Sequence, residues 1–291
     1  MPGPYVTVAA ADYSPALVSV LHAIVLGIVQ GLTEFLPISS TAHLRIVPAF
    51  LGWPDPGTAF TAVVQLGTMA AVLIYFWRDI LRITTTWLVS LRDPSRRGLL
   101  DARLGWYIGL GTIPIVIFGF IFRDQIESGG RNLYLIGVAL IVLGLVLLAA
   151  EEVSSRRRPL ESIGRDDGIT IGLAQSLALI PGVSRSGATI SAGLFRNFDR
   201  AAAARYSFLL SIPAVLLSGL YEFSKVVAGT EKTATSFGAL AVATLLAFVV
   251  GYASIAFLLR YLTTHSTRIF VAYRVGLGTV VLALTAAGAI S

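Results

Sequence analysis

Polar side chains within the apolar stretch 17–48 suggest the first site of chemistry. Glu34 is the only acidic residue of this stretch, and Gln30 lies one helical turn before it. A carboxylate at membrane depth is costly and marks a functional site. Gly27 and Gly31 share this helical face and let another helix approach closely. Because magnesium is bound by one or two carboxylates plus substrate phosphates, Glu34 and Gln30 can hold a divalent cation; the alternative is a Glu34 neutralised by burial.

Hydroxyl groups and a histidine follow directly after Pro37. Ser39, Ser40 and Thr41 are good helix N-caps, and His43 then falls in the first turn of the new helix. Free backbone N–H groups at a helix start bind anions, so a phosphate fits there. A serine needs an adjacent base to become a nucleophile, and His43 is close enough in sequence. Alternatively, His43 attacks or acts as the general acid.

A second polar patch carries the opposite charge. Arg185 is the only charged residue of the stretch 168–195, and Ser184, Ser186 and Thr189 lie beside it. A planar guanidinium binds phosphate in a bidentate manner. The G-x-x-x-x-G-K-[ST] pattern is absent, so the patch is not a Walker A loop.

Arg274, inside the last apolar stretch, is a weaker candidate. It can pair with Glu34, bind phosphate, or fix helix packing, and the sequence does not rank these roles. We expect His22 to be an ordinary interfacial histidine and His265 to be solvated.

Composition defines the class of protein that must position these residues. The 291 residues are 55% hydrophobic and only 13% charged, which excludes an ordinary soluble enzyme. There is no cysteine, so disulfides and thiolate chemistry are excluded. Six apolar runs are long enough to cross a bilayer as helices: 58–77, 104–122, 133–150, 206–221, 237–259 and 269–290. We therefore expect an all-α, polytopic membrane protein.

Two further apolar stretches, 17–48 and 169–195, are interrupted by proline-containing polar patches at 37–41 and 181–186. Non-helical backbone at membrane depth is tolerated where it is buried in protein or lines a wet cavity. We expect two re-entrant helical hairpins, with proline-kinked spans as the alternative.

Basic residues in the linkers predict orientation. Six arginines lie in the linker 78–103, and four more lie at 156, 157, 158 and 165. Cytoplasmic loops are enriched in such residues, so both linkers are expected inside the cell. The first hairpin then enters from the outer face and the second from the cytoplasmic face. The basic residues, for a formal net charge of +6, report orientation rather than nucleic-acid binding. Residues 1–16 lack the basic segment of a cleavable signal peptide, so we expect none.

The two interrupted stretches share a spacing. Gly27, Gln30 and Ser39 match Gly172, Gln175 and Ser184 with a constant offset of 145 residues. We therefore expect one membrane domain, 1–291, built from inverted repeats at about 17–150 and 169–290. Inverted repeats of this kind hold ligands near the bilayer midplane.

These residues closely resemble the undecaprenyl-diphosphate phosphatase family of the bacitracin-resistance type. The likeness rests on GIVQGLTEFLPISSTAH at 27–43 and PGVSRSGAT at 181–189, with VVQLGTMAAV at 63–72 and YSFLLSIPAV at 206–215. The resemblance implies a multi-pass enzyme of the bacterial plasma membrane. It hydrolyses a C55 isoprenyl diphosphate to the monophosphate carrier lipid of cell-wall synthesis, with Mg²⁺ or Ca²⁺, and confers bacitracin resistance. A second copy of the chain, forming a homodimer, is a candidate partner besides the lipid substrate and the bilayer.

The family's motifs fall on particular residues of this chain. They are Gln30 and Glu34, Ser39 and Ser40, His43, and Ser184, Arg185, Ser186 and Thr189. Gln30 stands where some members have Glu, which puts a two-carboxylate metal site in doubt, and Ala42 stands where glycine is common.

Residues and resemblance together give one mechanistic hypothesis. Glu34 with Gln30 holds the cation, Arg185 neutralises the diphosphate, and Ser40 attacks with help from His43. The rival class is a transporter or flippase, since broken helices within inverted repeats also describe carriers. A carrier needs no nucleophile, so Ser40 and His43 favour the enzyme, whose site we expect to open to the outer face.

Overall fold

The computed structural model describes residues 19–123, 125–126, 131–228 and 235–291. Residues 1–16, for which we expect no signal peptide, lie outside these ranges. The described part is helical, and it includes an isolated β-bridge between Arg158 and Phe198.

Six helices are long and apolar enough to cross a membrane. They are α3 (Gly57–Tyr75), α5 (Leu100–Ile121), α7 (Leu133–Val153), α10 (Arg200–Val227), α11 (Phe237–Tyr261) and α12 (Arg268–Ala286). The six predicted spans are thereby confirmed. Helix α10 starts six residues earlier than its apolar run, because Asp199 accepts the Ala202 N–H at 2.7 Å and caps a first turn rich in alanine.

Both predicted interruptions are present. The first separates α1 (Val20–Thr33) from α2 (Ser40–Leu51), and the second separates α8 (Arg165–Gln175) and a 3₁₀ turn (Ser176–Leu179) from α9 (Arg185–Phe195). Ser39 and Ser184 precede α2 and α9 with φ of 75° and 71°. Each accepts the backbone N–H three residues on, at 3.4 and 3.1 Å. Because a positive φ is rare outside glycine, the match between the two loops is specific.

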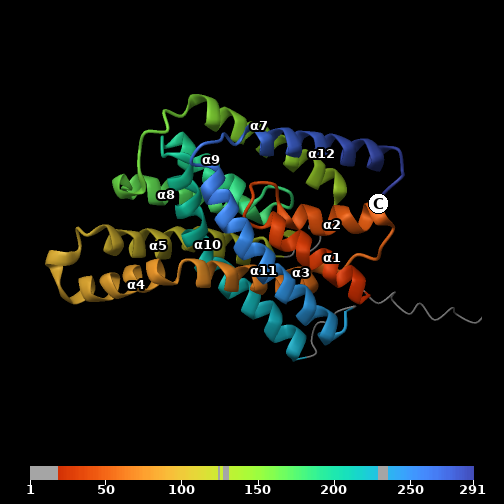
Figure 1. Ribbon diagram of the computed structural model, residues 1–291, viewed down its shortest axis with the longest axis horizontal. Coiled ribbons are helices and arrows are strands. Elements are labelled where there is room, and N and C mark those ends of the chain that lie inside the picture. Colours follow the sequence, from red (N-terminus) through yellow and green to blue (C-terminus); the bar gives the residue numbers. More distant parts are fainter. Residues whose placement is uncertain (1–18, 124, 127–130, 229–234) are drawn as a thin grey trace, which may run out of the picture.

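The linker predicted at 78–103 contains a helix that the apolar pattern did not indicate, α4 (Trp77–Arg92). It lies beside α5 (Figure 1). Trp87 packs edge-on against Trp106 and over Gly105 of α5. The helix is amphipathic, so a search for continuous apolar runs missed it.

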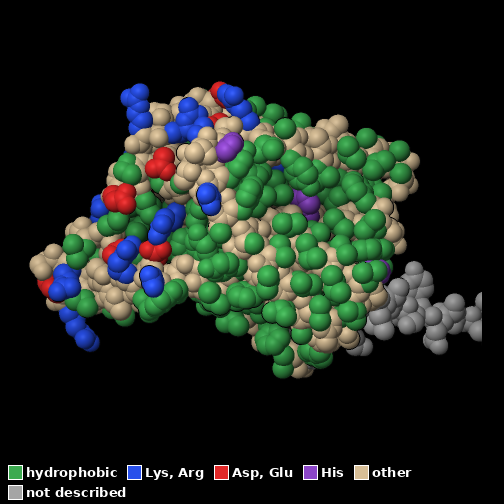
Figure 2. Space-filling model, viewed as in Figure 1, with side chains coloured by type: hydrophobic (Ala, Val, Ile, Leu, Met, Phe, Trp, Pro, Cys, Tyr) green, Lys and Arg blue, Asp and Glu red, His purple; other side chains and the backbone are tan. Residues whose placement is uncertain are grey.

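Close helix contacts position the two interrupted stretches. Gly27 of α1 packs against the backbone of Ala243 in α11, and Gly172 of α8 packs against Gly111 in α5. A Cβ at either glycine would lie under 3 Å from that backbone. Charged side chains gather on one side of the molecule, over α4, α5, α8 and the C-terminal end of α7, while the remainder of the visible face is largely apolar (Figure 2). The spans and this distribution describe a multi-pass membrane protein.

Candidate active site

Glu34, at the C-terminal end of α1, lies at the centre of a polar cluster. Its Oε2 accepts Gln30 Nε2 at 3.0 Å and Ser40 Oγ at 2.5 Å. The loop after α1 turns the chain back, so Ser40, the first residue of α2, meets Glu34, which directly follows α1. Ser40 is thereby held against a carboxylate oxygen that can take its proton.

Two residues from other helices donate hydrogen bonds to the second carboxylate oxygen of Glu34. Its Oε1 accepts Gln65 Nε2 at 2.9 Å and Arg185 Nη2 at 3.3 Å. Arg185 and Glu34 are 151 residues apart, and their side chains are 17% and 10% exposed. The tertiary structure therefore unites the acidic and basic motifs in one site. Sequence reasoning missed Gln65, whose signal was an amide in the apolar run of α3.

His43 is oriented by two hydrogen bonds. Its Nδ1 lies 2.7 Å from the Ser39 carbonyl oxygen, which can only accept, so Nδ1 carries a proton. Its Nε2 lies 2.7 Å from the Tyr273 hydroxyl, and the two rings stack with an interplanar angle of 6°. Tyr273 was not predicted, although it precedes the singled-out Arg274.

The structure does not form the expected contact between the Ser40 hydroxyl and the His43 ring. Within the described residues, the Ser40 hydroxyl is bonded to Glu34, and both ring nitrogens of His43 have other partners. The reason is helical direction: the His43 side chain points back over the preceding turn and reaches Ser39, four residues earlier. The carboxylate beside the Ser40 hydroxyl is that of Glu34.

The hydroxyls of the first loop shape its backbone. Ser39 Oγ lies 3.2 Å from Thr41 Oγ1 and caps α2 through the Ala42 N–H. Ser39 is buried and Thr41 is exposed. Thr41 is thus the accessible hydroxyl at the start of α2.

The second loop joins the first. Ser184 Oγ caps α9 and lies 3.1 Å from Ser186 Oγ, which donates to the Leu36 carbonyl at 3.1 Å. Thr189 lies 2.6 Å from Ser207 of α10 and is fully buried. Thr189 therefore holds α9 against α10, whereas Ser186 links the two loops.

Arg274 is fully buried, and its guanidinium donates to backbone carbonyls of three segments. The acceptors are Pro37, Leu140, Ala139, Gly182 and Val183, at 3.0 to 3.3 Å. Of the three roles left open by the sequence, these contacts are those of a packing residue, and no bond to Glu34 is formed. Arg274 connects the first loop, the second loop and α7.

The donors near Glu34 fit a divalent cation. Gln30 Oε1 is buried and has no hydrogen-bond partner, so an oxygen ligand is available beside the carboxylate. No group of three or more His, Cys, Asp or Glu that could hold a metal occurs among the described residues. A cation here would take its remaining ligands from phosphate and water, as magnesium commonly does.

The two other histidines lie apart from this cluster. His22 stacks on Trp53 with ring centroids 4.0 Å apart, and His265 is exposed beside Thr264. Both observations agree with their predicted ordinary roles.

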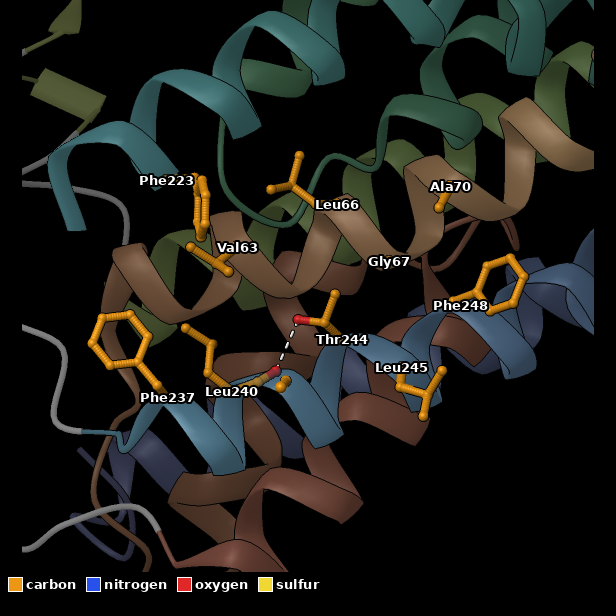
Figure 3. Close-up of a pocket in the computed structure, with 11 residues that line it drawn as sticks. Val63, Leu66, Gly67, Ala70, Phe223, Phe237, Leu240, Thr244, Leu245 and Phe248 are labelled. Carbon is orange, nitrogen blue, oxygen red and sulfur yellow. Dashed lines mark hydrogen bonds between the residues drawn. The ribbon is translucent and has the colours of Figure 1, made fainter. Parts of the chain in front are cut away.

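An apolar groove of about 520 Å³ lies between α3, α10 and α11 (Figure 3). Leu66, Phe223 and Phe248 line it, and its hydroxyl, Thr244, donates to Leu240 of its own helix at 2.8 Å. Gln65 is on the opposite face of α3 from this groove by helical periodicity. The groove suits hydrocarbon and lies apart from the polar cluster.

Fold and site together define a multi-pass helical membrane protein whose buried carboxylate, hydroxyl and arginine suit a phosphorylated lipid. Residues 23–280 match the family model described as bacitracin resistance protein BacA. An undecaprenyl-diphosphatase of Nocardioides sp. is 54% identical over 275 residues, which cover 94% of this chain and 100% of that protein. Those of Prosthecochloris aestuarii and Thermobifida fusca are 52% and 51% identical, covering 93% and 94% of this chain and 98% and 92% of theirs. The chain belongs to the BacA family.

Proposed function

We infer that the chain hydrolyses undecaprenyl diphosphate to undecaprenyl phosphate and inorganic phosphate. Relatives that are named for this activity match the chain over nearly its whole length. The observation that carries the chemistry is the Ser40 hydroxyl 2.5 Å from Glu34, which is itself paired with Arg185. The product is the carrier lipid of cell-wall synthesis, and the family name connects the activity to bacitracin resistance. A flippase needs no hydroxyl and base in contact, so this pair disfavours that alternative.

Ser40 Oγ attacks the terminal phosphorus while Glu34 Oε2 takes its proton. The bond from that phosphorus to the bridging oxygen breaks, and undecaprenyl phosphate leaves. Water then attacks the phosphorus of the phosphoserine, and the bond from that phosphorus to Ser40 Oγ breaks. Glu34 returns its proton to Ser40 Oγ, and inorganic phosphate leaves with the protons of the water. Arg185 exchanges its contact with Glu34 for the phosphate, and the N-termini of α2 and α9 add N–H donors.

His43 and Tyr273 form the other flank of this site. The Tyr273 hydroxyl donates to Nε2 of the neutral imidazole, whose Nδ1–H is fixed by Ser39. These two hydrogen bonds fix one tautomer and one ring orientation of His43 at the start of α2. His43 positions the loop that carries Ser40.

Glu34 and Gln30 Oε1 would hold the divalent cation, Mg²⁺ or Ca²⁺. When bound, the cation neutralises charge on the diphosphate. The unpaired Gln30 oxygen supports this assignment.

The two interrupted stretches form re-entrant hairpins of an inverted repeat, and the site opens to the outer face of the plasma membrane. The matched serines, both with positive φ and both capping a helix, support the repeat. Each interrupted stretch also packs on a helix of the other half of the chain, α1 on α11 and α8 on α5, which supports the repeat further. The arginine-rich linkers support the orientation.

The primary test is phosphate release from a C55 or C15 isoprenyl diphosphate by purified protein, with magnesium and with EDTA. We expect metal-dependent release that Arg185→Ala abolishes. Lipid bound without release under any metal would indicate a carrier instead.

Ser40→Ala tests the nucleophile. Because Ser40 forms the bond to phosphorus, we expect turnover to fall about 10³-fold with binding of the lipid retained. A near-normal rate would remove Ser40 from this role and favour water activated by Glu34.

A further inference from the structure

A second groove, of about 430 Å³, lies between α5 and α8, and its walls are apolar. Leu110, Ile169 and Leu173 line it and are 54%, 49% and 51% exposed. Trp106 lies at the same groove and is 43% exposed. On a membrane protein such a surface faces lipid chains.

Two arginines make this groove different from the one in Figure 3, which has no charged lining residue. Arg103 donates through Nη1 and Nη2 to backbone carbonyls at 3.1 and 3.4 Å, and its Nε is buried without a partner. Arg165 is exposed. Within the described part of the chain, neither guanidinium has a carboxylate in an ion pair. Two uncompensated positive charges therefore lie at one groove.

The arginines lie at the same end of the groove because α5 and α8 run in the same direction. Tyr107 contacts Gly168, and Gly111 contacts Gly172 one turn further along both helices. Both helix N-termini, with their positive dipole ends, therefore lie at the arginine end. From Arg165 to Leu173, the apolar wall extends about 12 Å along α8.

We propose that this groove is a binding site for an anionic phospholipid of the bilayer. The headgroup phosphate lies between Arg103 and Arg165, and an acyl chain follows Leu110 and Leu173. Trp106 lies at the membrane surface, where indole rings are enriched. The arginine linkers place this end at the cytoplasmic leaflet. The site shares no residue with the polar cluster around Glu34 and is independent of the proposed hydrolysis.

Native mass spectrometry of the purified full-length chain tests this, with phosphatidylglycerol and phosphatidylcholine of equal chain length as probes. We expect wild type to prefer phosphatidylglycerol, and Arg165→Gln to weaken that binding about fivefold, the usual effect of one arginine near a charged lipid surface. Within the described residues, the Arg165 side chain makes no hydrogen bond or ion pair to the rest of the protein, so this variant should fold normally. Arg157→Gln, an exposed arginine of the same linker, is the matched control and should bind like wild type.

A second variant, Leu173→Trp, fills the apolar wall without changing charge, and we expect it to reduce binding of phosphatidylglycerol. Equal binding of the two lipids by wild type would overturn the proposal. So would a loss in Arg157→Gln equal to that in Arg165→Gln, because general surface charge would then explain the preference. The two test variants, Arg165→Gln and Leu173→Trp, should retain wild-type phosphate release in detergent.

Discussion

The loops at 37–41 and 181–186 share one backbone feature and have opposite chemistry. Each places a serine with positive φ before a helix, and each serine caps that helix. The first loop is preceded by Glu34 and followed by His43, whereas the second carries Arg185 directly after its serine. One loop therefore brings a carboxylate and hydroxyl groups, and the other brings positive charge.

This difference shows how two similar loops can contribute different groups to one site. A helix start that offers N–H groups suits an anion at either loop. What distinguishes the loops is the side chain that follows each capping serine: Ser40 in the first loop and Arg185 in the second. The Glu34–Arg185 pair and the Arg274 contacts then hold the two loops together.

The largest effect is expected where the first loop loses its base. Glu34→Gln keeps the size of the side chain but cannot take the Ser40 proton, so we expect turnover to fall about 10³-fold or more. Steady-state phosphate release measures this, and excess magnesium should not restore it. A wild-type rate would contradict both the base and the metal assignment.

Arg185→Lys tests whether the second loop contributes geometry as well as charge. Lysine retains the charge but loses the planar, bidentate donor, so we expect kcat to fall about 10²-fold. The same assay at saturating lipid reports this. Full activity in the lysine variant would mean that a point charge suffices in the second loop.

Tyr273→Phe should have a smaller effect, because it removes one hydrogen bond to His43 and leaves the ring stack. We expect about a fivefold loss of kcat, in line with a single neutral hydrogen bond. The pH profile of kcat should also shift, because His43 Nε2 loses its hydrogen-bond partner. An unchanged profile would mean that Tyr273 only fills space.

Ion pairs link the start of α8 to the end of α9 and to the segment before α8. Burial raises the pKa of Asp167, whereas hydrogen bonds from Arg158 and Arg196, at 2.7 and 2.6 Å, lower it. Together the hydrogen bonds and the positive charges outweigh burial, so the pKa lies below its ordinary value. The stabilisation is therefore present above the unfolded-state pKa near 4 and is lost as pH falls through the lower folded-state pKa.

Asp167→Asn should accordingly lower the melting temperature at pH 7 and weaken its fall on acidification. Thermal unfolding of the purified protein between pH 3 and pH 7 measures both, with the exposed Asp166→Asn as the control. A melting temperature equal to wild type at pH 7 would show that the ion pairs of Asp167 do not hold these segments together.

Much of the fold was predictable from local sequence. The six spans follow from the length of each apolar run, and the two interruptions follow from proline and polar residues at membrane depth. Glu34 and Arg185 were identified because an isolated charge in an apolar stretch is costly. Helix α4 was missed because its apolar face is discontinuous in sequence.

The partners of these residues were decided by the tertiary structure. Gln65 meets Glu34 from another helix, and Tyr273 meets His43 across 230 residues. Ser40 is close to His43 in sequence, yet its hydroxyl is bonded to Glu34. Sequence alone determined which segments are apolar enough for the membrane and which polar residues within them mark a functional site. The reason is that the free-energy cost of burying a polar side chain depends on the local sequence. Which side chains meet depends on how helices pack, and that is set by contacts between segments far apart in the chain.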